Sequence, residues 1–138
     1  MGDIALVAGE IAMVYPRLCE TYNVEAGEAI TKGQVVCWDT DGQVIVADGN
    51  QAARDEPVGI ALRAGAAGET ISILVRGIME GFTVSAQNTG VILTLSDNIG
   101  AMETAGAGEH CGRIWALSGG TTAEYVVFID FDIPAASV

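Results

Sequence analysis

The chain has 138 residues, half of them hydrophobic, and a formal net charge of −12 from 18 acidic and 6 basic residues. This length suffices for a domain that folds without a disulfide or a metal, and the hydrophobic content argues against disorder. The charge argues against nucleic acid as a partner, because such binding relies on Lys and Arg side chains that neutralise phosphates.

The three cysteines, Cys19, Cys37 and Cys111, form no C-x-x-C pair and cannot all close into disulfides. We therefore expect free thiols and synthesis in a reducing cytoplasm. The first apolar run is too short to span a bilayer and has no basic residue before it, so we expect neither a membrane segment nor a secretion signal. Cys37 and its neighbour Trp38 are interpreted as core residues.

Residues 1–23 differ in pattern from the rest of the chain. Apolar residues alternate with other residues in two runs, at 4–8 and 11–15, which are separated by Gly9 and Glu10 and end before Pro16. Such alternation is typical of extended structure. Two arrangements fit: an arm that becomes ordered only on a partner, and the first strands of the main domain.

From residue 24 to residue 138 the chain reads as a single β domain. Short β-branched runs are separated by Gly, Asp-Gly and Pro corners, which is the pattern of a meander of antiparallel strands. The strands are expected at residues 29–31, 34–39, 43–47, 57–62, 70–76, 89–95, 113–117 and 125–133. The fold class is therefore all-β: a compact barrel or β-tulip-like domain of short antiparallel strands with Gly-rich corners and little helix.

The remaining segments are expected to be loops. Residues 48–56 form a polar loop with one helical turn at 51–54, residues 101–108 form a Gly- and Ala-rich loop, and residues 134–138 form a short tail. Alternation in the last strand places its apolar residues on one face and two carboxylates on the other. The apolar residues are Val127, Ile129, Phe131 and Ile133, and the acidic ones are Asp130 and Asp132.

A weak internal similarity relates the two halves of the domain. Shifting the sequence by about 55 residues aligns Val36 with Val91, Leu62 with Leu117 and Glu69 with Glu124. Chance explains such a match in a chain rich in Gly and Ala, and so does a pair of similar hairpin modules at residues 35–75 and 90–130. Both explanations stay open.

No residue pattern in the chain indicates catalysis, a cofactor or a metal. Asp39 and Asp41 resemble the start of a calcium loop, but the spacing to Asn50 is wrong, so a hairpin turn is favoured. Neighbours on a strand point to opposite faces, which argues against zinc at His110 and Cys111. Asp130 and Asp132 share a strand face but have no second catalytic region beside them, and Lys32 lies outside the hairpin tip that a biotinyl or lipoyl carrier needs.

Four segments follow one another in an order found in a known family. They are residues 27–36, 41–49, 57–62 and 67–77, and they contain a G-x-x-V strand, the strand Val-Gly-Ile-Ala and the strand Ala-Gly-Glu-Thr-Ile. In this order they resemble the small head decoration proteins, or capsid cement proteins, of tailed bacteriophages. The resemblance is clear over about 50 residues and rests on strands and corners.

The resemblance implies a non-enzymatic structural protein. Such a protein forms a homotrimer, binds the major capsid protein lattice on the outer surface of the mature virion, and is made in the cytoplasm of the bacterial host. It needs no cofactor, nucleic acid or membrane. Two alternatives are another phage structural barrel, from the tail or baseplate, and a small trimeric β-barrel enzyme.

We assign the capsid contact to the amino-terminal segment. Its alternating apolar side chains carry little charge, and an extended chain end can add to a strand edge or lie in a groove of the shell. The capsid-binding residues predicted in this way are Ile4, Leu6, Val7, Ile11, Met13 and Tyr15.

Overall fold

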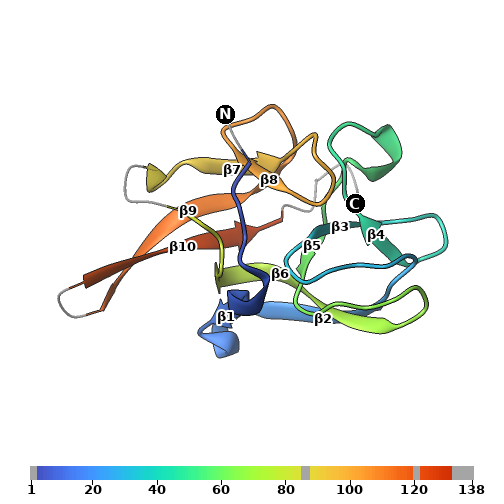
Figure 1. Cartoon of the computed structure of the whole chain (residues 1–138), viewed down its shortest axis with the longest axis horizontal. Helices are drawn as coiled ribbons and strands as arrows, with labels where there is room; N and C mark the ends of the chain where they lie inside the picture. The colour runs from blue at the N-terminus through green and yellow to red at the C-terminus, as the bar shows by residue number, and fades with distance from the viewer. Residues whose placement is uncertain (1–2, 85–87, 120–121, 132–138) are drawn as a thin grey trace.

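The computed structural model describes residues 3–84, 88–119 and 122–131, and in these residues the protein is nearly all β (Figure 1). Its strands join into one antiparallel sheet that curls into a half-barrel, which confirms the predicted fold class. The strands are β1 (Ala12–Val14), β2 (Glu20–Glu25), β3 (Val35–Trp38), β4 (Val44–Val46), β5 (Gly59–Ala61), β6 (Thr70–Glu80), β7 (Ile92–Leu95), β8 (Met102–Thr104), β9 (His110–Gly119) and β10 (Thr122–Asp130).

The strand order is symmetric about the pair formed by β6 and β10. Along the sheet the order is β4-β3-β5-β6-β10-β9-β7-β8, so the first unit runs 6-5-3-4 outwards and the second runs 10-9-7-8. Equivalent pairs are Ile60 with Leu74 in the first unit and Ile114 with Val127 in the second. Ile60 and Ile114 are 54 residues apart, and Leu74 and Val127 are 53 residues apart. Both separations are close to the offset of about 55 in the sequence.

The long strand β6 organises the amino-terminal strands. One side of it pairs with β5 and then β10, and the other side pairs with β2 and then β1. Short 3₁₀ turns interrupt the chain at Ala8–Glu10, Pro16–Leu18 and Ala52–Arg54. The last of these is the helical turn predicted at residues 51–54.

One strand was not predicted, and two predictions about local structure are wrong. Residues 20–25 form β2, which the apolar pattern does not reveal because its side chains are mostly exposed and its pairing with β6 uses the backbone. The loop predicted at 101–108 contains β8, a short edge strand anchored by the buried Met102. The strand predicted at 29–31 is reduced to one bridge between Ile30 and Gly65, because the Thr31–Lys32–Gly33 corner follows at once.

The sheet buries side chains on both faces of its first unit. The main core cluster lies inside the half-barrel and draws on both units, with Val35, Ile60 and Leu74 from the first and Ile114 and Val127 from the second. The second cluster lies on the outer face of the first unit only. Its members are Ala26, Ile30, Val36, Val44, Val46, Ala61, Ile71 and Ile73. Strands buried on both faces read as continuous apolar runs, as β3 does.

A bulge in β6 changes which face its side chains meet. Leu74 and Met79 are five residues apart and would point to opposite faces of a regular strand, yet both belong to the main cluster. The register against β2 shifts between Glu20 and Thr21, which places an extra residue in β6 at this point. Before the bulge, Ile71 and Ile73 on the outer face of β6 pack in the second cluster. After the bulge, the residues on the outer face belong to neither cluster.

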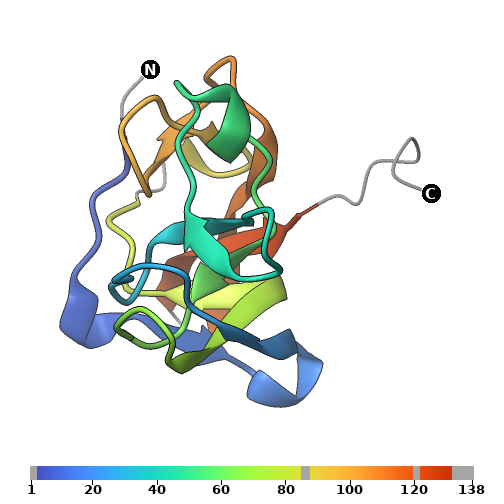
Figure 2. The same ribbon diagram turned by 90° about the vertical axis from the view of Figure 1, so that its right-hand side faces the viewer.

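The amino-terminal segment runs along the open side of the half-barrel, as the blue trace in Figures 1 and 2 shows. The Ile4 N–H donates to Met102 O at 2.9 Å, and the Val7 N–H donates to Gly81 O at 2.8 Å. The Asp3 carboxylate accepts hydrogen bonds from Ser96 and Asn98, each at 2.6 Å. The segment thus ties β8 to the chain that follows β6. No helix in the described residues is long and apolar enough to cross a membrane.

Candidate functional site

The polar residues singled out in the sequence serve structural roles in the described chain. Asp39 Oδ1 accepts hydrogen bonds from the N–H groups of Asp41 (2.8 Å) and Gln43 (3.0 Å) and so holds the turn between β3 and β4. The hairpin interpretation is confirmed. Asp130 Oδ1 accepts from Arg76 Nε at 2.9 Å in an ion pair on the sheet surface, and Asp132 and Ile133 lie outside the described residues.

The cysteines are free thiols, and two of them are buried. Burial raises the pKa of Cys37 to about 11 and the pKa of Cys111 well above its ordinary value. Among the described residues no group of three or more His, Cys, Asp or Glu side chains gathers at metal-binding distance. Cys37 is a core residue as predicted, but Trp38, the last residue of β3, is 48% exposed.

The structure separates the six predicted capsid-binding residues into two groups. Ile11 is 2% exposed and lies in the main cluster, and three others are half-buried against that cluster: Ile4, Leu6 and Met13. Val7 and Tyr15 are exposed, at 48% and 56%. The segment is therefore part of the sheet and its core in this structure, and two of the six side chains, Val7 and Tyr15, are exposed.

Exposed apolar side chains continue from Tyr15 along the edge of the molecule. Leu18, in the 3₁₀ turn between β1 and β2, is 79% exposed, and Tyr22 on β2 is 54% exposed. Tyr15 has φ 54°, a left-handed conformation that turns the chain from β1 into this corner. We call Tyr15, Leu18 and Tyr22 the amino-terminal edge. Sequence reasoning missed Leu18 and Tyr22 because β2 itself was missed.

The amino-terminal edge lies on β2 and on the turn that joins β1 to β2, and each of these strands has one neighbour. In the described part of the chain, β1 and β2 pair with β6 and with no other strand. Glu20 pairs with Arg76 at 3.4 Å, and the Tyr22 hydroxyl donates to Glu20 at 2.9 Å, so the charges beside the edge are partly balanced. A strand edge with exposed aromatic side chains suits a partner that offers an extended chain.

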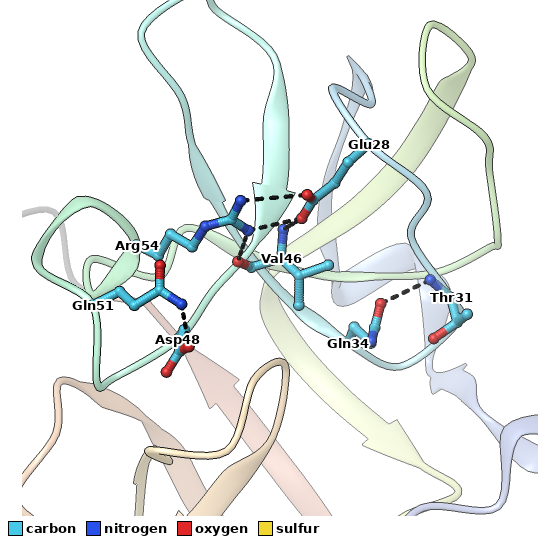
Figure 3. A network of polar contacts seen from close by, with 7 residues as sticks. All are labelled: Glu28, Thr31, Gln34, Val46, Asp48, Gln51 and Arg54. Carbon is cyan, nitrogen blue, oxygen red and sulfur yellow. Dashed lines mark hydrogen bonds and ion pairs between the residues drawn. The ribbon is translucent and has the colours of Figure 1, made fainter.

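The opposite edge of the sheet is closed by side chains (Figure 3). On β4 the Val46 N–H donates to Glu28 Oε2 at 2.9 Å, and Val46 O accepts from Arg54 Nη1 at 3.0 Å. Arg54 also donates to both oxygens of Glu28, at 2.8 and 3.3 Å, and this lowers the pKa of Glu28. The backbone groups of Val46 that face outwards are occupied, so a strand from another chain cannot pair there.

A loop completes this closed edge. Asp48 Oδ2 accepts from Gln51 Nε2 at 2.9 Å, and the Asp48 N–H donates to Arg54 O at 2.9 Å. The Thr31 N–H donates to Gln34 Oε1 at 2.9 Å and fixes the corner before β3. This polar network closes the β4 edge, whereas the amino-terminal edge has no such closure among the described residues.

Comparison with known proteins identifies the chain. Searches among curated proteins and among solved structures gave no match. The family model of the phage cement protein matches residues 7–77, which is 71 of the 138 residues. The match starts in the amino-terminal segment, includes the amino-terminal edge and ends at the bulge of β6. Because it covers just over half of the chain, the protein belongs to the phage cement protein family, whose members are structural proteins that bind and stabilise the capsid.

Proposed function

We propose that this protein is a trimeric decoration protein that binds the outer surface of the mature capsid through its amino-terminal edge and has no enzymatic activity. The family match over residues 7–77 carries the proposal, since this segment holds Tyr15, Leu18 and Tyr22 together with the strands that position them. The residues with potential for chemistry are engaged in turns, ion pairs and the core.

The physical effect on the shell follows from linkage. A ligand that binds the expanded lattice and has no affinity for the dissociated subunits stabilises the lattice by the free energy of binding. A trimer that contacts several capsid subunits at once adds its separate weak contacts as avidity. A small protein can therefore hold a shell against internal pressure without any chemical step.

The exposed side chains of the amino-terminal edge support its role as the contact. Burying a side chain such as Leu18 or Tyr15 contributes about 1.5–3 kcal/mol each by transfer from water. In an isolated subunit Leu18 is 79% exposed, so the free energy of burying it becomes available only when a partner covers it. The unpaired side of β2 adds backbone groups that an extended segment of a capsid subunit can pair with.

Charge and thiols support the remaining parts of the proposal. The net charge of −12 disfavours contact with packaged or free nucleic acid. Three free thiols, two of them in the core, fit synthesis in the reducing cytoplasm of a bacterial host.

Co-sedimentation with purified capsids tests the proposal. The wild-type protein is expected to bind expanded capsids and not unexpanded ones, and to raise the temperature at which expanded capsids release DNA. The double variant Tyr15→Ser/Leu18→Ser is expected to lose at least about tenfold in affinity, which corresponds to ~1.4 kcal/mol. Its circular dichroism and melting temperature should match the wild type, because both side chains are exposed.

Ile99→Ser is the matched control, since Ile99 is 53% exposed and lies on a different loop. If the double variant decorates capsids at full occupancy, the contact is elsewhere, and the Gly-rich loops at residues 64–68 and 106–109 become the candidates. If the wild-type protein binds neither capsid form, the proposed function is wrong.

A further inference from the structure

The outer face of the second unit is an apolar surface that its own chain covers only in part. Residues paired in register lie on the same face of a sheet. One row crosses β1, β6, β10, β9 and β7 through Val14, Ile78, Phe128, Arg113 and Ile92. Trp115 and Val126, which pair with each other, lie on the same face two residues along β9 and β10.

These side chains belong to neither core cluster. Trp115 is 43% exposed and Ile92 is 38% exposed, while Phe128 is half-buried and Val126, between them, is 3% exposed. The rings of Trp115 and Phe128 lie with centroids 5.5 Å apart and tilted by 43°. Figure 1 shows β9 and β10 as a long hairpin that reaches beyond the rest of the half-barrel. We call this surface the outer face.

In the first unit, the corresponding outer face is covered by another segment of the chain. Its equivalent pair, Ala61 with Ile73, is buried in the second cluster under Ala26 and Ile30 from the connection between β2 and β3. No described segment covers Trp115 in the second unit. Two units with the same strand order thus differ in that one outer face is covered by its own chain.

The charges on the outer face are complementary to each other. Arg113 on β9 and Glu80 on β6 lie on opposite sides of β10, and neither forms an ion pair with a described side chain. Arg76 pairs with both Glu20 and Asp130 along one border, which leaves one negative charge there. In a chain of net charge −12, a face that carries Arg76 and Arg113 repels another copy less than a purely acidic face does.

We infer that the outer face binds a second copy of this chain, with Trp115 at the centre of the contact and Arg113 of one copy paired to Glu80 of the next. The inference deepens the proposed trimer and rests on self-association, not on capsid binding. Because the cation and the carboxylate lie on different sides of the face, one side can meet the other side of the next copy. A head-to-tail contact of this kind forms a trimeric ring if the rotation between copies is one third of a turn.

The two rings cover only part of the area that a contact needs. A standard interface buries ~800 Å² on each partner, and Trp115 is 43% exposed and Phe128 half-buried, so the neighbouring side chains of the outer face must supply most of that area. Clusters of Trp and Arg near the centre of an interface also carry most of the binding free energy in measured complexes.

Light scattering and sedimentation equilibrium of the full chain, without capsids, test the inference. Trp115→Ser and Arg113→Glu are each expected to weaken self-association by about tenfold or more. The controls are Trp38→Ser, which removes the other exposed Trp, and Arg63→Glu, which makes the same change of charge at an exposed loop residue. Both controls should associate like the wild type.

A charge swap tests the pairing between copies. Glu80→Arg should weaken association as Arg113→Glu does, and the double variant Arg113→Glu/Glu80→Arg should restore it to near the wild-type level. Recovery also shows that both substitutions together are compatible with the fold, and circular dichroism of each single variant checks its own fold. If the double variant stays dissociated while circular dichroism shows a native fold, the pairing is wrong.

Fluorescence identifies what covers Trp115. In the variant Trp38→Phe, Trp115 is the one remaining tryptophan, and its emission should shift to the blue as the protein concentration rises into the range where copies associate. A shift that is independent of concentration and disappears on deleting residues 132–138 would mean that the tail is the occupant, and would overturn the inference.

Capsid co-sedimentation of the same variants separates this inference from the proposed function. Loss of self-association with some remaining capsid binding supports a face used between copies. A wild-type protein that is monomeric into the high micromolar range overturns the inference, whether or not it binds capsids. So does a Trp115→Ser variant that associates normally but no longer binds capsids, because the outer face would then contact the shell.

Discussion

At the scale of single residues, Gly77 allows β6 to change partners. It has φ +144° and lies against Cys19, at the place where β1 ends and β2 begins on the other side of β6. A Cβ atom on Gly77 would lie 2.5 Å from Cys19 Sγ and 3.1 Å from Cys19 Cα. Neither the side chain nor the backbone of Cys19 can move away easily, because Cys19 packs against the main cluster.

Gly77→Ala is therefore expected to destabilise the protein by about 2–4 kcal/mol, from backbone strain at positive φ and from the contact with Cys19. Chemical denaturation measures the change. Gly68→Ala is the control: Gly68 has φ +87°, but a Cβ atom at this position would meet no atom within 4 Å, so this variant carries the strain without the contact. The additional variant Cys19→Ala should recover part of the loss. Equal effects of Gly77→Ala and Gly68→Ala would show that the contact with Cys19 costs nothing.

At the scale of elements, the protein closes both ends of its sheet with its own chain. On β4, Gly27 donates to Val44 O at 2.8 Å, and Glu28 and Arg54 occupy the Val46 backbone. On β8, Ile4 donates to Met102 O. Open edges lead to uncontrolled pairing between chains. Closing both ends leaves an unpaired side, among the described strands, on β1, on β2 and on the outer part of the β9–β10 hairpin.

Arg54→Ala is expected to destabilise the fold by about 1–3 kcal/mol, because it removes three hydrogen bonds and leaves Val46 O and the Glu28 carboxylate without this donor. Arg63→Ala is the control, since Arg63 is exposed. A melting temperature of Arg54→Ala equal to that of Arg63→Ala would contradict a structural role for the network.

The same network predicts a pH dependence. The pKa of Glu28 is lowered in the folded protein, chiefly by Arg54, so its contribution to stability is present above the unfolded value of 4.5 and is lost as the pH falls through the lower folded value. The difference in unfolding free energy between wild type and Glu28→Gln should therefore shrink below pH 4.5. A constant difference across that range would show that ionised Glu28 is not the stabilising form.

Sequence patterns predicted those elements whose own side chains carry the signal. Strands β3 to β6 were found because Val and Ile alternate or cluster between Gly and Pro corners, and the family resemblance lies in the same segment. Strand β2 was missed because it contributes backbone pairing and exposed side chains. The outer face was missed because Asp130 indicated a solvated face, although Val126 and Phe128 lie on that same face.

At the scale of the whole molecule, the weak similarity between the two halves of the sequence corresponds to a matching order of strands in the two units. We propose that residues 35–75 and 90–130 are two copies of one four-strand module joined through β6 and β10. The equal order of strands around that pair supports the proposal. The copies then diverged on their outer faces, where one acquired a cover from residues 24–30 and the other kept an open surface.

The amino-terminal segment stabilises the fold, and we propose that it also binds the capsid. Deletion and substitution variants separate these two roles. Removing residues 2–15 takes Ile11 from the main cluster, β1 from β6 and the cap from β8. Losing one buried Ile costs about 2–5 kcal/mol, so the truncated chain is expected to be strongly destabilised and to aggregate, as soluble yield and denaturation midpoint will show.

Val7→Ser/Tyr15→Ser alters the exposed side chains and should leave stability unchanged while weakening capsid binding. A truncated protein that is soluble, with an unchanged midpoint, and that fails to bind capsids would instead mean that the segment is a separable arm, and that its packing on the half-barrel adds nothing to the stability of the fold.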